Sequence, residues 1–113
     1  MPEQPVLQAL MDVIVQRRDH PPAGRSYVVS LLNGGVPAIG AKLTEEAGEV
    51  VEAAAEPGAE GRAHLIHEIA DLLFHTMVLM GHQRIGLEDV ENALAARFGI
   101  GGHDEKESRG LSR

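Results

Sequence analysis

The segment Leu65-Ile-His-Glu-Ile-Ala-Asp-Leu-Leu-Phe-His75 is apolar for most of its length, yet it contains Glu68 and Asp71. A helix that is apolar on most sides is expected to be buried on most sides. At about 100° per residue, the two carboxylates lie about 60° apart on one helix face. Burying a carboxylate without a partner costs roughly several kcal/mol of free energy. This segment therefore predicts a buried helix whose acidic residues have a partner.

A second acidic run, Lys42-Leu-Thr-Glu-Glu-Ala-Gly-Glu49, precedes that segment. Glu46 and Glu49 repeat the i, i+3 relation, and Glu45 lies beside them. Acidic pairs on two successive helices can converge on one point, and hard divalent cations are the natural partners of an all-oxygen site. The two segments therefore predict a magnesium site.

The rest of the chain also shows helical periodicity, and no strand pattern or internal repeat is present. We expect an all-α fold, an antiparallel bundle of four to five helices, in a domain spanning residues 1–99. Residues 100–113 form a polar, glycine-rich tail that is too polar to pack alone but could become ordered on a ligand. Four of the expected helices are Val6–Arg18, Pro37–Ala55, Arg62–Arg84 and Gly86–Gly99. A further short helix is expected to begin after an N-cap at Ser26 and to end at Asn33.

The composition limits the functional classes. A chain of 113 residues suits one domain, and dimerisation would add buried area. A net charge of -7 argues against nucleic acid as a partner, since binding there relies on Lys and Arg. The chain has no cysteine, no recognisable signal sequence and no apolar run long enough to span a membrane. We therefore expect a cytoplasmic protein without a membrane partner.

The acidic residues suit the cleavage of a phosphoric anhydride. In that reaction a protein positions the phosphates, neutralises their charge and aligns a water molecule. Four carboxylates and a triphosphate would overwhelm one magnesium ion, so we expect more than one. Glu45 is then available as a general base or as a partner of the metal site. His75 lies on the face of Glu68 and Asp71 and could donate a hydrogen bond to phosphate, although a hydrogen-bonded core histidine is the commoner role.

Two motifs carry a resemblance to a known family: Glu45-Glu46-Ala-Gly-Glu49 and Glu68-Ile-Ala-Asp71. They resemble the signature of the all-α nucleoside triphosphate pyrophosphohydrolases related to MazG. Further segments are similar to the phosphoribosyl-ATP pyrophosphohydrolases in particular. These segments are Ser26-Tyr27, Leu31-Leu32 with Gly35, Lys42, Ala70 to His75, Val90 to Leu94 with Arg97, and Glu105-Lys106 ahead of Ser108-Arg109.

This resemblance implies hydrolysis of phosphoribosyl-ATP to phosphoribosyl-AMP and pyrophosphate, the second step of histidine biosynthesis, by a homodimer. It also implies magnesium, for which manganese can substitute. The implied metal ligands are Glu46, Glu49, Glu68 and Asp71, and the implied catalytic residues are Glu45 and Glu49. The candidate substrate-binding residues are Lys42, His75, Arg97, Lys106 and Arg109. The chain departs from the family pattern at Phe74, where the family has Tyr, and at Gly101-Gly102, where it has Ser-Gly.

Other hypotheses fit the acidic motifs. A housecleaning pyrophosphohydrolase would act on ordinary or damaged nucleoside triphosphates with the same metal centre, but Ser26-Tyr27 and Glu105-Lys106 argue against it. A non-catalytic acidic module could bind a protein or buffer cations. Such a module would not need Glu68 and Asp71 inside an apolar helix.

A solvated helix face is the commonest explanation of a Glu-rich run. Here Lys42 and Glu46 form the single i, i+4 ion pair that we expect, which leaves Glu49 and Glu52 without cationic neighbours on the helix.

Overall fold

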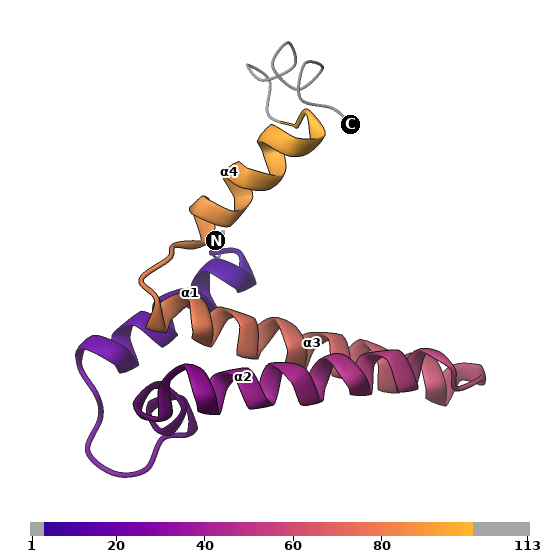
Figure 1. Ribbon diagram of the computed structural model, residues 1–113, viewed down its shortest axis with the longest axis horizontal. Coiled ribbons are helices and arrows are strands. Elements are labelled where there is room, and N and C mark those ends of the chain that lie inside the picture. Colours follow the sequence, from indigo (N-terminus) through magenta and orange to yellow (C-terminus); the bar gives the residue numbers. More distant parts are fainter. Residues whose placement is uncertain (1–3, 101–113) are drawn as a thin grey trace.

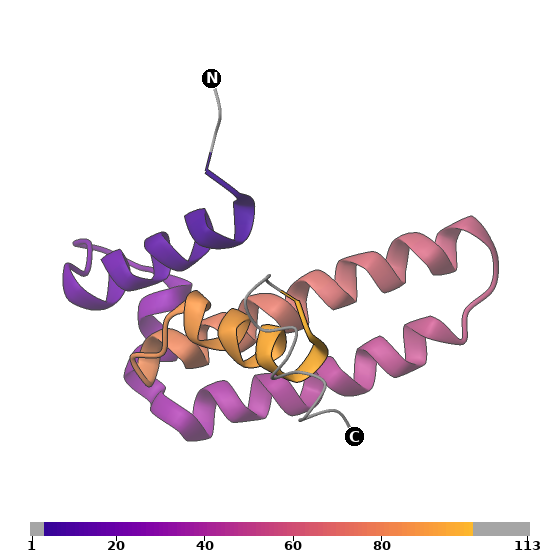
Figure 2. The same ribbon diagram turned by 90° about the horizontal axis from the view of Figure 1, so that it is seen from above.

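The computed structural model describes residues 4–100, which form four α-helices and no strand. Helices α2 and α3 run antiparallel as a long hairpin, α1 crosses one end of it, and α4 projects away (Figures 1 and 2). The predicted all-α antiparallel bundle is confirmed. Within the described range, no helix combines the length and hydropathy needed to cross a bilayer. The helices are α1 Val6–Asp19, α2 Tyr27–Ala54, α3 Gly58–His82 and α4 Leu87–Phe98.

Helix α2 contains a kink that divides it as the sequence predicts. Ser26 caps its start, because the Ser26 Oγ accepts a hydrogen bond from the Val29 backbone N–H at 3.2 Å. Gly35 then leaves helical geometry with φ 69° and ψ -161°, and Pro37 follows in the next turn. The expected short and long helices are therefore two parts of one kinked element.

Helix α3 begins and ends earlier than the predicted bounds of Arg62–Arg84. It starts at Gly58, directly after Pro57, whose missing N–H is harmless at a helix start. It ends at His82 because the next turn closes on itself: the Ile85 N–H donates to the Met80 carbonyl oxygen at 2.9 Å. The Arg84 N–H donates to the Gly81 carbonyl oxygen at 3.2 Å, which completes a Schellman motif.

The apolar core lies at the end of the hairpin that α1 crosses. Gly81 permits the close approach of α1, since its own position faces Ile14, which is fully buried. This end of the molecule supplies most of the apolar burial that holds the hairpin together. The core residues are Met11, Ile14, Val28, Leu31, Ile39, Met77, Val78 and Met80.

The expectation that α3 is buried on most sides is wrong for a single chain. Its outer half packs against α2 on one side, while Ile66, Ile69 and Leu73 remain 57%, 41% and 45% exposed. These residues follow i, i+3, i+7 spacing and form one stripe along the helix. One neighbouring helix covers only one face of α3. The apolar pattern therefore overestimated how much of this helix is buried within a single chain.

Replacing Gly81 by alanine should destabilise the protein by about 1–3 kcal/mol. The new Cβ would lie 2.6 Å from Ile14 Cγ2, on a β-branched side chain that cannot rotate away easily. Urea denaturation measures the loss. Gly48→Ala is the matched control, because its Cβ meets nothing within 4 Å and alanine favours a helix by about 0.5–1 kcal/mol. Equal stability of Gly81→Ala and wild type would contradict the close packing of α1.

Candidate metal centre

Three of the predicted ligands converge between α2 and α3. Glu46, Glu49 and Glu68 each offer one carboxylate oxygen, and these three oxygens all lie within 4.8 Å of one another. Glu46 and Glu68 are buried, at 6% and 8% exposure, and Glu49 is half-buried. The i, i+3 spacing on α2 therefore brings both of its acids against α3, as the sequence predicts.

The cluster fits a hard divalent cation. Oε1 of Glu46 and Oε1 of Glu68 are buried without any hydrogen-bond donor. Buried carboxylate oxygens are normally paired, because the free energy of leaving them unpaired is high. An all-oxygen donor set of this kind suits Mg²⁺ or Mn²⁺. The two orphaned oxygens are therefore available to bind a cation.

Mutual repulsion and burial change the proton affinity of the cluster. Burial, together with the neighbouring Glu68 carboxylate, raises the pKa of Glu46 to about 7. Contact with Glu68 also raises the pKa of Glu49. Burial acts to raise the pKa of Glu68 as well, but its contacts with Glu49, Glu46 and His64 outweigh burial and lower it. Without a cation, the cluster therefore retains a proton close to neutral pH.

Two histidines that the sequence reasoning missed hold the acids of α3. His64 Nε2 lies 3.1 Å from Glu68 Oε2, and His64 Nδ1 lies 3.0 Å from Glu56 Oε1. The bond with Glu56 raises the pKa of His64. The i, i+4 spacing of His64 and Glu68 was the available signal. His64 fixes one oxygen of Glu68 and leaves the other directed at the cluster.

Asp71 lies beside the cluster and not within its tightest group. One carboxylate oxygen of Asp71 lies within 4.8 Å of potential ligand atoms of Glu68 and His67. Glu46 and Glu49 do not belong to this second group. His67 Nε2 approaches Asp71 Oδ2 at 3.4 Å, again at i, i+4 spacing. Glu68 thus belongs to both groups, and the four predicted ligands form two overlapping sets.

Glu45 and Lys42 lie on the outside of α2. Lys42 Nζ pairs with Glu45 Oε1 at 3.2 Å, and this contact raises the pKa of Lys42. The expected pair between Lys42 and Glu46 is therefore wrong. The physical reason is orientation: Glu46 points into the hairpin, whereas the exposed Glu45 reaches Lys42 at i, i+3 spacing.

His75 is held by hydrogen bonds at both ring nitrogens. Nδ1 lies 2.9 Å from the Asp71 carbonyl oxygen, so Nδ1 carries the proton and donates it. Nε2 therefore accepts from the Tyr27 hydroxyl at 2.8 Å. The Phe74 ring lies 4.9 Å from the His75 ring and 6.2 Å from the half-exposed Tyr27 ring. A phosphate contact by His75 stays a prediction, and it requires Tyr27 to release Nε2.

Of the remaining predicted substrate-binding residues, the described part of the chain contains Arg97, which does not lie at the cluster. Arg97 lies in the last turn of α4, the helix that points away from α2 and α3 (Figure 1), and its guanidinium stacks 5.9 Å from the Phe98 ring. Lys106, Arg109 and the predicted tail lie outside the described residues.

The helical hairpin and its buried acids define an all-α protein with a carboxylate centre suited to divalent cations. The chain belongs to the phosphoribosyl-ATP pyrophosphohydrolase family, whose model matches residues 7–98.

Relatives agree with this assignment over nearly their whole length. A phosphoribosyl-ATP pyrophosphatase of Rhodopirellula baltica is 47% identical over 96% of this chain and 91% of its own. The phosphoribosyl-ATP pyrophosphatase of Geobacter sulfurreducens is 47% identical, covering 92% of this chain and 93% of its own. One from Neisseria meningitidis is 43% identical, with 92% and 94% covered. No solved structure is significantly similar to the chain.

The melting temperature of the metal-free protein should fall as the pH rises from about 5 to 8. Folded Glu46 binds its proton up to a pKa of about 7, whereas the unfolded chain releases it near 4.5. Raising the pH between these values therefore favours unfolding. The raised pKa values of Glu49 and His64 act in the same direction.

Thermal denaturation in EDTA at both pH values measures this slope. Glu46→Gln should flatten it, whereas the exposed Glu52→Gln on the same helix should leave it unchanged. A melting temperature that rises with pH would show that the acids do not repel one another in the folded state.

Proposed function

We propose that this protein hydrolyses phosphoribosyl-ATP between its α and β phosphates and releases phosphoribosyl-AMP and pyrophosphate, in the second step of histidine biosynthesis. Family membership and the names of the relatives support this substrate. The observation that carries the chemistry is the pair of buried, unpartnered oxygens on Glu46 and Glu68. A protein that only presented an acidic surface to a partner would leave those oxygens in water.

Glu46, Glu49 and Glu68 would hold magnesium, with Asp71 available for a second ion through the group that it shares with Glu68. Magnesium, when bound, supplies positive charge that offsets the negative charge of the phosphates and favours attack by water. The protein's own part is to fix the oxygens in place. His64 does this for Glu68 through a hydrogen bond, and His67 lies within ion-pair distance of Asp71.

The two predicted catalytic residues have different positions. Glu49 lies in the cluster, where the carboxylate of Glu68 raises its pKa. Glu45 is exposed and bonded to Lys42. Because Glu49 lies in the cluster whereas Glu45 is bonded to Lys42, we assign acceptance of the water proton to Glu49. Glu45 then acts indirectly by orienting Lys42 at the edge of the site.

Magnesium-dependent pyrophosphate release from phosphoribosyl-ATP should be lost in Glu49→Gln and Asp71→Asn. We expect each change to reduce kcat/KM by at least about 100-fold, since each removes an oxygen from the cluster or its neighbour. Circular dichroism should show unchanged helical content. Glu52→Gln, an exposed acid on the same helix, is the control and should retain full activity.

Substrate profiling separates this proposal from its alternatives. Comparable turnover of several unrelated nucleoside triphosphates would favour a housecleaning enzyme. Absence of pyrophosphate release from any substrate with magnesium present would rule out both enzyme hypotheses. The predicted cytoplasmic location and the expected absence of nucleic-acid and membrane partners stay predictions.

The functional unit is proposed to be a homodimer formed through α3. The stripe of Ile66, Ile69 and Leu73 is exposed, although it lies on the helix that carries the acid cluster. The outer part of the α2–α3 hairpin extends beyond α1 and α4, so nothing else in the described chain covers it (Figure 2). Contiguous apolar surface of this kind marks an interface, and a second copy supplies the matching apolar stripe.

Leu73→Asp should convert the dimer into monomers. A charge placed in an apolar interface is expected to weaken association by at least about 2 kcal/mol. Sedimentation velocity measures the change in mass. Val6→Asp is the control, because Val6 is 78% exposed at the start of α1 and outside the stripe. A wild-type chain that sediments as a monomer would contradict the proposed dimer.

A further inference from the structure

His64 bonds to two carboxylates at once, one in the turn after α2 and one on α3. Its Nε2 lies 3.1 Å from Glu68 Oε2, and its Nδ1 lies 3.0 and 3.1 Å from the two carboxylate oxygens of Glu56. An ionised carboxylate only accepts hydrogen bonds, so both ring nitrogens donate and the ring carries a positive charge. The raised pKa of His64 agrees with this form. Glu56, His64 and Glu68 therefore form a continuous chain of contacts from the surface to the acid cluster.

The turn between α2 and α3 is shaped so that Glu56 reaches His64. The Glu56 N–H donates to the Ala53 carbonyl oxygen at 3.0 Å, which ties the turn to the end of α2. Gly61 is buried in the first turns of α3, and a Cβ there would overlap the carbonyl group of Glu56. Glycine permits this close approach of two backbone segments. Because Gly61 precedes His64 by three residues, Glu56 is held against the face of α3 that carries His64.

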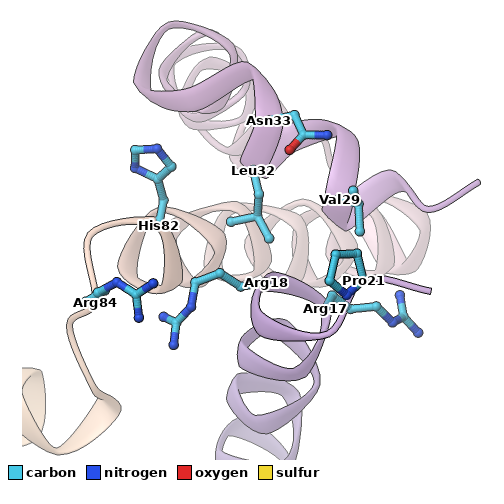
Figure 3. A pocket seen from close by; sticks show the side chains of 8 residues that line it. All are labelled: Arg17, Arg18, Pro21, Val29, Leu32, Asn33, His82 and Arg84. Carbon is cyan, nitrogen blue, oxygen red and sulfur yellow. The ribbon is translucent and has the colours of Figure 1, made fainter. Parts of the chain in front are cut away.

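The other cationic side chains lie away from the acid cluster. Three arginines surround a cavity of about 220 Å³ at the end of the hairpin that α1 crosses (Figure 3). Lys42 pairs with the exposed Glu45. Within residues 4–100, no lysine or arginine bonds to the acid cluster, and His64 is the one histidine that does. The bonded cationic contact of the cluster in this part of the chain therefore comes from His64 alone.

The two bonds of His64 differ in their surroundings. Glu56 and His64 have side chains that are 47% and 43% exposed, so their contact contributes little stability by itself. The Glu68 side chain is only 11% exposed. His64 holds its Oε2, and its Oε1 is buried without a donor. Both oxygens belong to one planar carboxylate group, so a bond that fixes Oε2 also fixes the direction of Oε1.

We propose that Glu56 is a positioning residue for the metal centre, which acts through His64 to hold Glu68 in the orientation that binds a divalent cation. The turn between α2 and α3 thereby becomes part of the metal centre, although Glu56 is not one of the ligands. The inference rests on the metal-binding part of the proposed function. Partners that orient a metal ligand in this way typically change metal affinity by about 10–100-fold.

Binding of Mn²⁺ to the metal-free full chain, measured by electron paramagnetic resonance of the free ion, tests this arrangement. His64→Leu should weaken binding at least about 10-fold. The direction separates two effects, because the loss of a positive charge beside the cluster would by itself strengthen cation binding. His64→Gln should restore part of the affinity, since its amide places an N–H donor near the position of Nε2.

Glu56→Ala should weaken Mn²⁺ binding about 3-fold, as expected for the loss of an exposed ionic contact. Glu60→Ala removes the same charge from an exposed position in the first turn of α3 and should bind Mn²⁺ as wild type does. In a His64→Leu background, Glu56→Ala should have no further effect, because Glu56 acts through His64.

Unchanged or tighter Mn²⁺ binding in His64→Leu would overturn the proposal. An equal effect of Glu56→Ala with and without His64 would overturn it too. A lower melting temperature with unchanged affinity would show that these residues only stabilise the turn, which also contradicts it. A wild-type protein that binds Mn²⁺ but releases no pyrophosphate from phosphoribosyl-ATP would refute the proposed function alone, because the binding measurement does not depend on turnover. A wild type that binds no Mn²⁺ would refute the metal centre itself.

Discussion

The pairing of α2 with α3 forces like charges together inside the protein, and the rest of the structure has to offset that cost. Glu46 and Glu68 are buried with unpaired oxygens. The offset comes from the other end of the hairpin, where α1 packs over Ile39 and Val78. Stability and chemistry are thus separated along one pair of helices. Because of this arrangement, the buried acids can stay unpaired and free to bind a cation without unfolding the hairpin.

Much of the fold could be predicted from residue periodicity. The stretches around α1 and α4 gave nearly correct bounds, and Ser26 marked the start of α2. The end of α3 was placed too late because Arg84, an ordinary helix former, adopts a left-handed conformation there. Burial of α3 could not be predicted from its own sequence, since it depends on how many neighbours the hairpin has.

The acid cluster was predictable to the extent that it depends on local geometry. The i, i+3 spacing brought Glu46 and Glu49 onto one face, and antiparallel pairing brought Glu68 to them. The choice of Glu45 as the partner of Lys42 depends on side-chain orientation, which spacing alone does not resolve. The bond between Tyr27 and His75 joins residues 48 positions apart, and no local pattern contains that information.

That same bond gives the protein an optical property. Tyr27 is the only tyrosine, and the chain has no tryptophan, so its near-ultraviolet fluorescence comes from this one ring. The Tyr27 hydroxyl bonds to His75 Nε2, and His75 Nδ1 bonds to the carbonyl oxygen of Asp71. Any rearrangement of α3 at Asp71 would therefore change the environment of the emitting ring. The protein carries its own label next to the acid cluster, and events there can be followed by emission without a dye.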